Sequence, residues 1–107
     1  MNALKQRDYE ARARILKALA HPSRLMMVDE LSRGERCVCE LTALVGSDIS
    51  TVSKHLSLLK SAGIVEREKR GLQVFYRLHA PCVLDFFGCL ETARRQGVCC
   101  APVPRSG

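Results

Sequence analysis

The 107-residue sequence has no tryptophan, and aromatic residues make up only 5% of the chain. It has no glycine-rich phosphate loop and no nucleophile, base and acid set of the kind that forms a catalytic site. It also lacks an apolar run long enough to span a membrane, and its polar start, MNALKQRDYEARAR, is unlike a signal peptide. We therefore expect a cytoplasmic protein that is not an enzyme and needs no organic cofactor.

Positive charge and cysteine are what the sequence does contain. Its 17 Lys and Arg residues oppose 11 Asp and Glu residues, which gives a net charge of +6. A small basic domain favours a polyanionic partner, most often nucleic acid. Six cysteines in a reducing compartment indicate metal, metalloid or redox chemistry before a disulfide framework. With 47% apolar residues, the chain can build one domain with a modest core.

The stretch from Asp48 to Gly63 has the pattern of a single helix with two different faces. Asp48 or Ser47 can cap its start, and Gly63 can end it in the left-handed conformation. Spacings of three and four predict a buried face made of Ile49, Val52, Leu56 and Leu59. The other face is short and polar, and it consists of Ser50, Thr51, Ser53, Lys54 and Ser57.

Three shorter helices are predicted before this one. The first runs from about Arg7 to Leu19, with Ala11, Ile15, Ala18 and Leu19 as its apolar stripe. The second starts at Pro22, where a missing N–H costs nothing, and His21 before it is expected to act as a cap or turn residue. We expect this helix to bury Leu25, Met26, Val28 and Leu31, with Met26 and Met27 as core filler.

The third helix is predicted from about Val38 to Val45, with Gly46 as its stop. Its inward residues are expected to be Leu41, Leu44 and Val45. Two short helices, a glycine-containing turn and a polar-faced helix form a helix-turn-helix pattern.

Two β-rich runs follow Gly63, and they predict a hairpin with a basic, glycine-containing tip. The tip contributes Arg67, Lys69 and Arg70, which would extend the positive surface of the preceding helix over a DNA backbone. A last helix opens at Pro81 and ends at Gly97. It carries two apolar stripes and so needs two surfaces to bury against, its own core and a second copy of the chain.

The predicted fold is therefore mainly α with a β-hairpin, in the α+β class, with a winged helix-turn-helix architecture and a C-terminal helix for dimerisation. We expect residues 1–97 to form one DNA-binding and dimerisation domain and residues 98–107 to be a flexible tail that carries Cys99 and Cys100. Cys82 and Cys89 lie on an apolar stripe of the last helix and are expected in the core.

These segments together resemble the winged-helix repressors of the ArsR/SmtB family, which serve arsenical resistance and metal sensing. The resemblance is carried by ALAHPSRLMMVDEL, ERCVCEL, STVSKHLSLLKSAGIVEREKRG and VFYRL, in the family's order. It implies a homodimeric transcriptional repressor that binds a palindromic operator in double-stranded DNA and leaves it when an inducer binds. The implied DNA-binding residues are Ser50, Thr51, Ser53, Lys54, His55, Arg67, Lys69 and Arg70. For His55, packing or capping within the helix has equal weight.

The resemblance also points to an inducer site. Cys37-Val38-Cys39 is similar to the thiolate motif of arsenite- and cadmium-responsive members, and soft thiolates select As(III), Sb(III), Cd(II) or Pb(II). We expect As(III) or Sb(III) as the inducer. The third cysteine of the best-known arsenite motif is replaced by Thr42. Cys99 or Cys100, from the same chain or its partner, can complete the site, or these two alone can hold methylarsenite.

The family's zinc site is not matched, because the last helix offers Asp85 and Glu91 but no histidine. Residues two apart on a regular helix point about 200° apart. Binding of one ion by Cys37 and Cys39 is therefore expected to unwind or tilt the first turn of the third helix. Two alternatives stay open, a thiol-redox or persulfide sensor of the same fold and a zinc-stabilised structural module.

Overall fold

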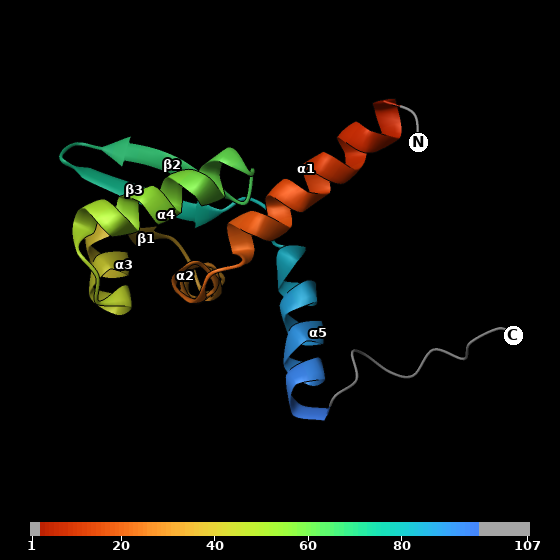
Figure 1. The fold of residues 1–107 in the computed structure, drawn as a ribbon. Coiled ribbons are helices and arrows are strands. Elements are labelled where there is room, and N and C mark those ends of the chain that lie inside the picture. The colour runs from red at the N-terminus through yellow and green to blue at the C-terminus, as the bar shows by residue number, and fades with distance from the viewer. Residues whose placement is uncertain (1–2, 97–107) are drawn as a thin grey trace, which may run out of the picture.

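A computed structural model describes residues 3–96 (Figure 1). Their helices and strands follow the order α1 Ala3–Leu19, α2 Pro22–Leu31, β1 Arg36–Cys37, α3 Val38–Val45, α4 Ile49–Ser61, β2 Val65–Arg70, β3 Gln73–Leu78 and α5 Val83–Gln96. The predicted class, mainly α with a β-hairpin, is confirmed. No helix within residues 3–96 is long and apolar enough to cross a membrane.

The sheet has three antiparallel strands in the order β1-β3-β2. Strands β2 and β3 form the predicted hairpin, the wing, which projects from the body in Figure 1. Its basic residues were expected at the tip, but they lie in β2, because strand pairing continues to Arg70 and Gln73. Strand β1 was not predicted, because a two-residue strand is too short to show a period. It pairs Arg36 with Tyr76 and Cys37 with Phe75, so the segment before α3 is attached to the wing.

The core lies where α2, α3, α4 and the base of the wing meet. Helix α4 crosses its centre and buries Val52, Leu56 and Leu59 completely. Ile49 was expected on the same face but is 54% exposed, because it is the first residue of α4 and lies beyond the core. A helical period predicts which side of a helix faces the core. It does not predict how far along the helix the core extends.

Two other helices also differ from prediction. Met26 is 45% exposed and Met27 is fully buried, so α2 buries Met27, Val28 and Leu31 and leaves Leu25 half-buried. In α3, Leu41 is buried, but Leu44 is exposed at the end away from the core. Met26 as core filler and Leu44 as an inward residue were therefore wrong predictions.

The first and last helices are poorly covered by the rest of the described chain. Helix α1 begins at Ala3, earlier than predicted, and only Ala18 and Leu19 reach the core, while Ala11 and Ile15 are exposed. Helix α5 contains no buried residue. Figure 1 shows that α1 and α5 both project from the side of the body away from the tip of the wing.

The two cysteines near α5 are not in the core. Cys82 is exposed, because it precedes the first residue of α5, and Cys89 is half-buried. The prediction that both are core residues was wrong for the described chain. The predicted boundary at Gly97 and the predicted tail, residues 98–107, lie outside the described residues.

Candidate nucleic-acid interface and thiol site

The polar face of α4 lies on the surface, as predicted. Ser50, Lys54 and Ser57 are exposed, and Ser53 is half-buried. The turn before the helix depends on Gly46, whose φ of +78° is left-handed and disfavours other residues. Lys54 has no ion-pair or hydrogen-bond partner among residues 3–96. Its ammonium is therefore available to a phosphate.

A carboxylate that was not predicted as a site residue stands at the start of this helix. Asp48 accepts hydrogen bonds from the hydroxyls of Ser50, at 2.6 Å, and Thr51, at 2.5 Å. These hydroxyls, Ser50 first, lower the pKa of Asp48. Asp48 thus fixes the direction of two hydroxyls at the helix start. In sequence it appeared only as an N-cap, so nothing pointed to this second role.

The wing has two electrostatically different faces. Alternate strand residues point to opposite faces, and Arg67 is in register with buried Tyr76 while Lys69 is in register with Val74. This face turns toward α4, and Arg67 lines a groove with Ser53, Ser57 and Lys60 of that helix. Neither Arg67 nor Lys69 has an ion-pair or hydrogen-bond partner among the described residues. The hydroxyls of α4 and two unpaired cations therefore share one surface.

The opposite face of the wing is a ladder of ion pairs. Arg77 pairs with Glu66 at 2.7 Å, and Arg70 pairs with Glu68 at 2.7 Å and with Glu35 at 2.6 Å. Hydrogen bonding to Arg70 lowers the pKa of Glu68. The structure thus places Arg70 apart from Arg67 and Lys69, so its predicted phosphate contact would require it to leave two carboxylates.

His55 points into the protein side of α4. Its Nδ1 lies 3.0 Å from Nη1 of Arg24, and its ring centroid is 4.4 Å from that of His21. His21 caps α2, as predicted, by accepting a hydrogen bond from the Ser23 N–H. Burial, followed by the charges of His21 and Arg24, lowers the pKa of His55.

The predicted thiol site has one buried and one exposed cysteine. Cys37 is 8% exposed and is the N-cap of α3, with extended backbone angles of φ −82° and ψ 161°, while Cys39 is exposed in the first turn. The Cys37 N–H donates to Oε1 of Glu40 at 3.0 Å and is the main cause of that carboxyl's lowered pKa. Cys37 is not helical, so the premise that both cysteines lie on a regular helix was wrong.

At the start of α3 the described residues offer only these two thiols, because Cys82 and Cys89 belong to the segment of α5. Among residues 3–96 no three His, Cys, Asp or Glu side chains are gathered as a metal site. Thr42, in the position of the missing third thiol, donates its hydroxyl to the Val38 carbonyl. Cys99 and Cys100 lie outside the described residues, so a two-thiol site fits this part of the chain and a three-thiol site needs a further ligand.

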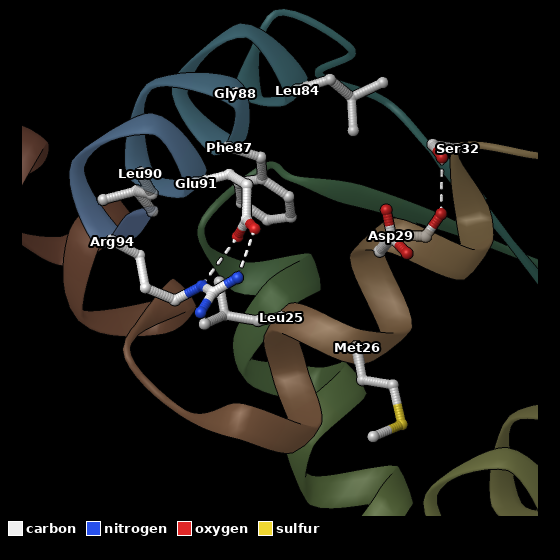
Figure 2. A pocket seen from close by; sticks show the side chains of 10 residues that line it. All are labelled: Leu25, Met26, Asp29, Ser32, Leu84, Phe87, Gly88, Leu90, Glu91 and Arg94. Carbon is white, nitrogen blue, oxygen red and sulfur yellow. Dashed lines mark hydrogen bonds and ion pairs between the residues drawn. The ribbon is translucent and has the colours of Figure 1, made fainter. Parts of the chain in front are cut away.

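A separate apolar groove between α2 and α5 was not predicted (Figure 2). Leu25 and Phe87 form its floor, and the Phe87 ring points toward α2. At its rim Glu91 accepts from Arg94 at 2.6 Å and from Arg95 at 2.7 Å, which lowers the pKa of Glu91 to about 2. The contact between α5 and the body is therefore thin and open to solvent.

Comparison with known proteins gives a consistent result. Residues 21–67 match the family described as "Bacterial regulatory protein, arsR family". The Biofilm growth-associated repressor of Agrobacterium fabrum is 43% identical over 76 residues, which are 71% of this chain and 64% of that protein. The HTH-type transcriptional regulator MJ1325 of Methanocaldococcus jannaschii is 42% identical over 69 residues, 64% of this chain and 78% of that one.

A solved structure extends the similarity over nearly the whole chain. The homodimeric winged helix-turn-helix DNA-binding domain Mb0332 from Mycobacterium bovis aligns with a TM-score of 0.78 and 31% identity, covering 91% of this chain and 90% of that one. Several curated relatives are longer, and the chain spans 35% to 64% of their length.

Proposed function

Because the chain belongs to the ArsR family of bacterial regulatory proteins, we propose that it is a transcriptional repressor that binds a palindromic operator as a homodimer. The observation that carries the proposal is the single surface formed by the polar face of α4 with Arg67 and Lys69 of the wing. Small hydroxyls let a helix approach base edges, and unpaired cations bind phosphates and release counterions.

The exposed apolar residues of α1 and α5 support the dimer. Ile15 and Leu16 of α1 and Phe86 and Leu90 of α5 are all exposed, although these helices need an apolar surface to be stable. Both helices project on the side away from the tip of the wing (Figure 1). A second copy that covers them would leave both recognition helices free to enter successive major grooves, about 34 Å apart.

Operator binding is tested with inverted-repeat fragments of promoter DNA at several salt concentrations. We expect salt-sensitive binding by a dimer, and Lys54→Gln should reduce the slope of log affinity against log salt by about one for each protomer. Arg33→Gln is the matched control, because Arg33 is exposed but pairs with Asp29 and Glu30 of α2. An affinity that does not change with salt, or that shows no preference for inverted repeats, would contradict the proposal.

For the inducer, we infer As(III) or Sb(III) bound by Cys37 and Cys39, with a further thiol from Cys99 or Cys100. The position of Cys37 supports this inference. It is held in β1 opposite Phe75 of the wing, while Cys39 belongs to α3, which packs against α4. A ligand that joins the two thiols would pull the start of α3 toward β1 and shift the support of the recognition helix. Such a ligand acts as an inducer only if it binds the DNA-free form of the protein more tightly than the DNA-bound form.

Titration of the protein–operator complex with arsenite, methylarsenite, cadmium and peroxide separates the candidate inducers. We expect arsenite to release the DNA from the parent chain and to fail with Cys37→Ser and Cys39→Ser. Cys82→Ser is the control, because its thiol is exposed and Cys82 directly precedes α5 instead of α3. Release by peroxide without arsenite would favour the thiol-redox alternative. Release of both Cys37→Ser and Cys39→Ser by methylarsenite would favour Cys99 and Cys100 as its ligands.

A further inference from the structure

Arg24 joins three helices at one point. From α2, its Nε donates to the Ala18 carbonyl at 2.6 Å and its Nη2 to the Lys17 carbonyl at 3.4 Å, both at the C-terminal end of α1. Its Nη1 lies 3.0 Å from Nδ1 of His55 in α4. One guanidinium therefore connects the end of α1 to the middle of the recognition helix.

The contact defines the protonation of His55. A guanidinium can only donate hydrogen bonds, so Nδ1 of His55 must carry a free lone pair to accept from Arg24. The neighbouring His21 is constrained in the same way, because its Nδ1 accepts the Ser23 N–H at 3.0 Å. The two rings lie 4.4 Å apart at 45°. A proton on Nδ1 of His55 would remove the bond to Arg24.

The surroundings of His55 disfavour its protonated form. Arg24 of α2 and His21, the N-cap of that helix, face it, and Arg14 and Lys17 of α1 line the adjoining groove with Arg24. On α4 itself the preceding residue is Lys54. None of the ion pairs among residues 3–96 includes His55. A protonated imidazole here would therefore meet cations from α1 and α2 and no carboxylate partner, and the charges would push α4 away from both helices.

We propose that Arg24 is a positioning residue for the recognition helix, which it holds against the end of α1 through an unprotonated His55, and that protonation of His55 weakens operator binding. The inference rests on the operator binding proposed above. It assigns His55 a role on the protein side of α4 in place of a DNA contact. The two roles predict opposite changes in operator affinity as the pH falls, because a protonated histidine that contacted a phosphate would strengthen binding at low pH.

The test measures operator affinity at pH 7.5 and pH 5.5, at constant ionic strength, for the parent chain, His55→Asn and His79→Asn. The amide oxygen of Asn at position 55 can accept from Arg24 near the place of Nδ1 and does not titrate. His79 is a matched control, because it is exposed and pairs with Glu66 of the wing.

We expect the parent chain and His79→Asn to bind the operator more weakly at pH 5.5 than at pH 7.5, because His55 takes up its proton more readily when the contact with Arg24 is released. His55→Asn should lose much less affinity. An equal loss in the parent chain and His55→Asn would overturn the inference, and so would a gain in affinity of the parent chain at pH 5.5. No salt-sensitive binding at pH 7.5 would instead refute the proposed function.

A second measurement needs no DNA. The pKa of His55 is lowered in the folded protein from an ordinary value of 6.5, so the unfolded chain takes up the proton first as the pH falls. The contribution of His55 to stability is therefore complete above pH 6.5 and is lost as the pH falls below it. The free energy of unfolding should fall more steeply with acid in the parent chain than in His55→Asn, and equal slopes would contradict a proton-dependent contact.

Arg24→Gln separates positioning from simple packing. Removal of the guanidinium takes away one of the charges that lower the pKa of His55, so this pKa should rise toward its ordinary value, measured by NMR of the imidazole. If the His55 titration is unchanged by Arg24→Gln in a folded protein, the contact has no influence on the proton and the inference fails.

Discussion

Arg70 of the wing donates to both carboxylate oxygens of Glu35, at 2.6 and 2.8 Å, across 35 residues of sequence. The same guanidinium lies 4.7 Å from the centroid of the Phe75 ring, and Phe75 is the residue that pairs with Cys37. Planar, bidentate pairing makes this contact stronger than an ordinary surface ion pair. The tip of the wing is therefore attached to the segment that leads into the thiol site.

This attachment predicts a small role for Arg70 in binding phosphate. Arg70→Gln should change the salt dependence of operator affinity less than Arg67→Gln, because Arg70 already neutralises Glu35 and Glu68. Its main effect should be lower protection of the wing amides from hydrogen exchange. If both variants reduce the salt slope equally, Arg70 leaves its carboxylates on the operator, as the sequence alone predicts.

The two faces of the wing predict a second difference in salt dependence. Arg67→Gln should reduce the slope of log affinity against log salt by about one for each protomer. Arg77→Gln should leave the slope nearly unchanged, because Arg77 is paired with Glu66 and Glu68 on the opposite face. Both variants remove one arginine from the same hairpin, so the comparison holds the net charge constant. A larger effect from Arg77 would mean that the other face meets the DNA.

The adjacent methionines of α2 predict effects on stability of very different size. Met27 is fully buried in the core, so Met27→Ala should lower the free energy of unfolding by about 2–5 kcal/mol. Met26 is exposed, and Met26→Ala should change it by no more than about 0.5 kcal/mol. Chemical denaturation of both variants at the same protein concentration measures the difference. Similar losses would show that Met26 is covered in solution, as in a dimer.

The burial of the two motif cysteines predicts different rates of alkylation. Cys39 is exposed and should react with iodoacetamide much faster than Cys37, which is buried at the N-cap of α3. Mass spectrometry of the peptide that contains both residues can assign the modified thiol by fragmentation. In denaturant the two rates should become similar, which is the control. Equal rates in the folded protein would mean that the start of α3 opens readily.

The predictions from sequence succeeded where a long local pattern repeated. The bounds of α3 and the existence of the wing hairpin followed from period and glycine position, and Gly63 has the expected left-handed conformation. The extent of the strands did not follow, because Arg67, Lys69 and Arg70 were expected at the tip and belong to β2. The predictions failed at the ends of elements. Ile49 and Leu44 lie on the apolar face of their helices, but both are exposed because they extend past the core. A helical period contains no information on where the elements that cover this face end.

The sequence by itself determined the order of elements, the winged helix-turn-helix class and the polar character of α4, because these depend on residues close together in the chain. Only the tertiary structure decided which charges remain free. Among residues 3–96 it pairs Arg70 with Glu35 and leaves Arg67 unpaired, and it turns His55 toward Arg24. Such choices join residues far apart in sequence, and they depend on strand register and helix packing, which no local pattern records.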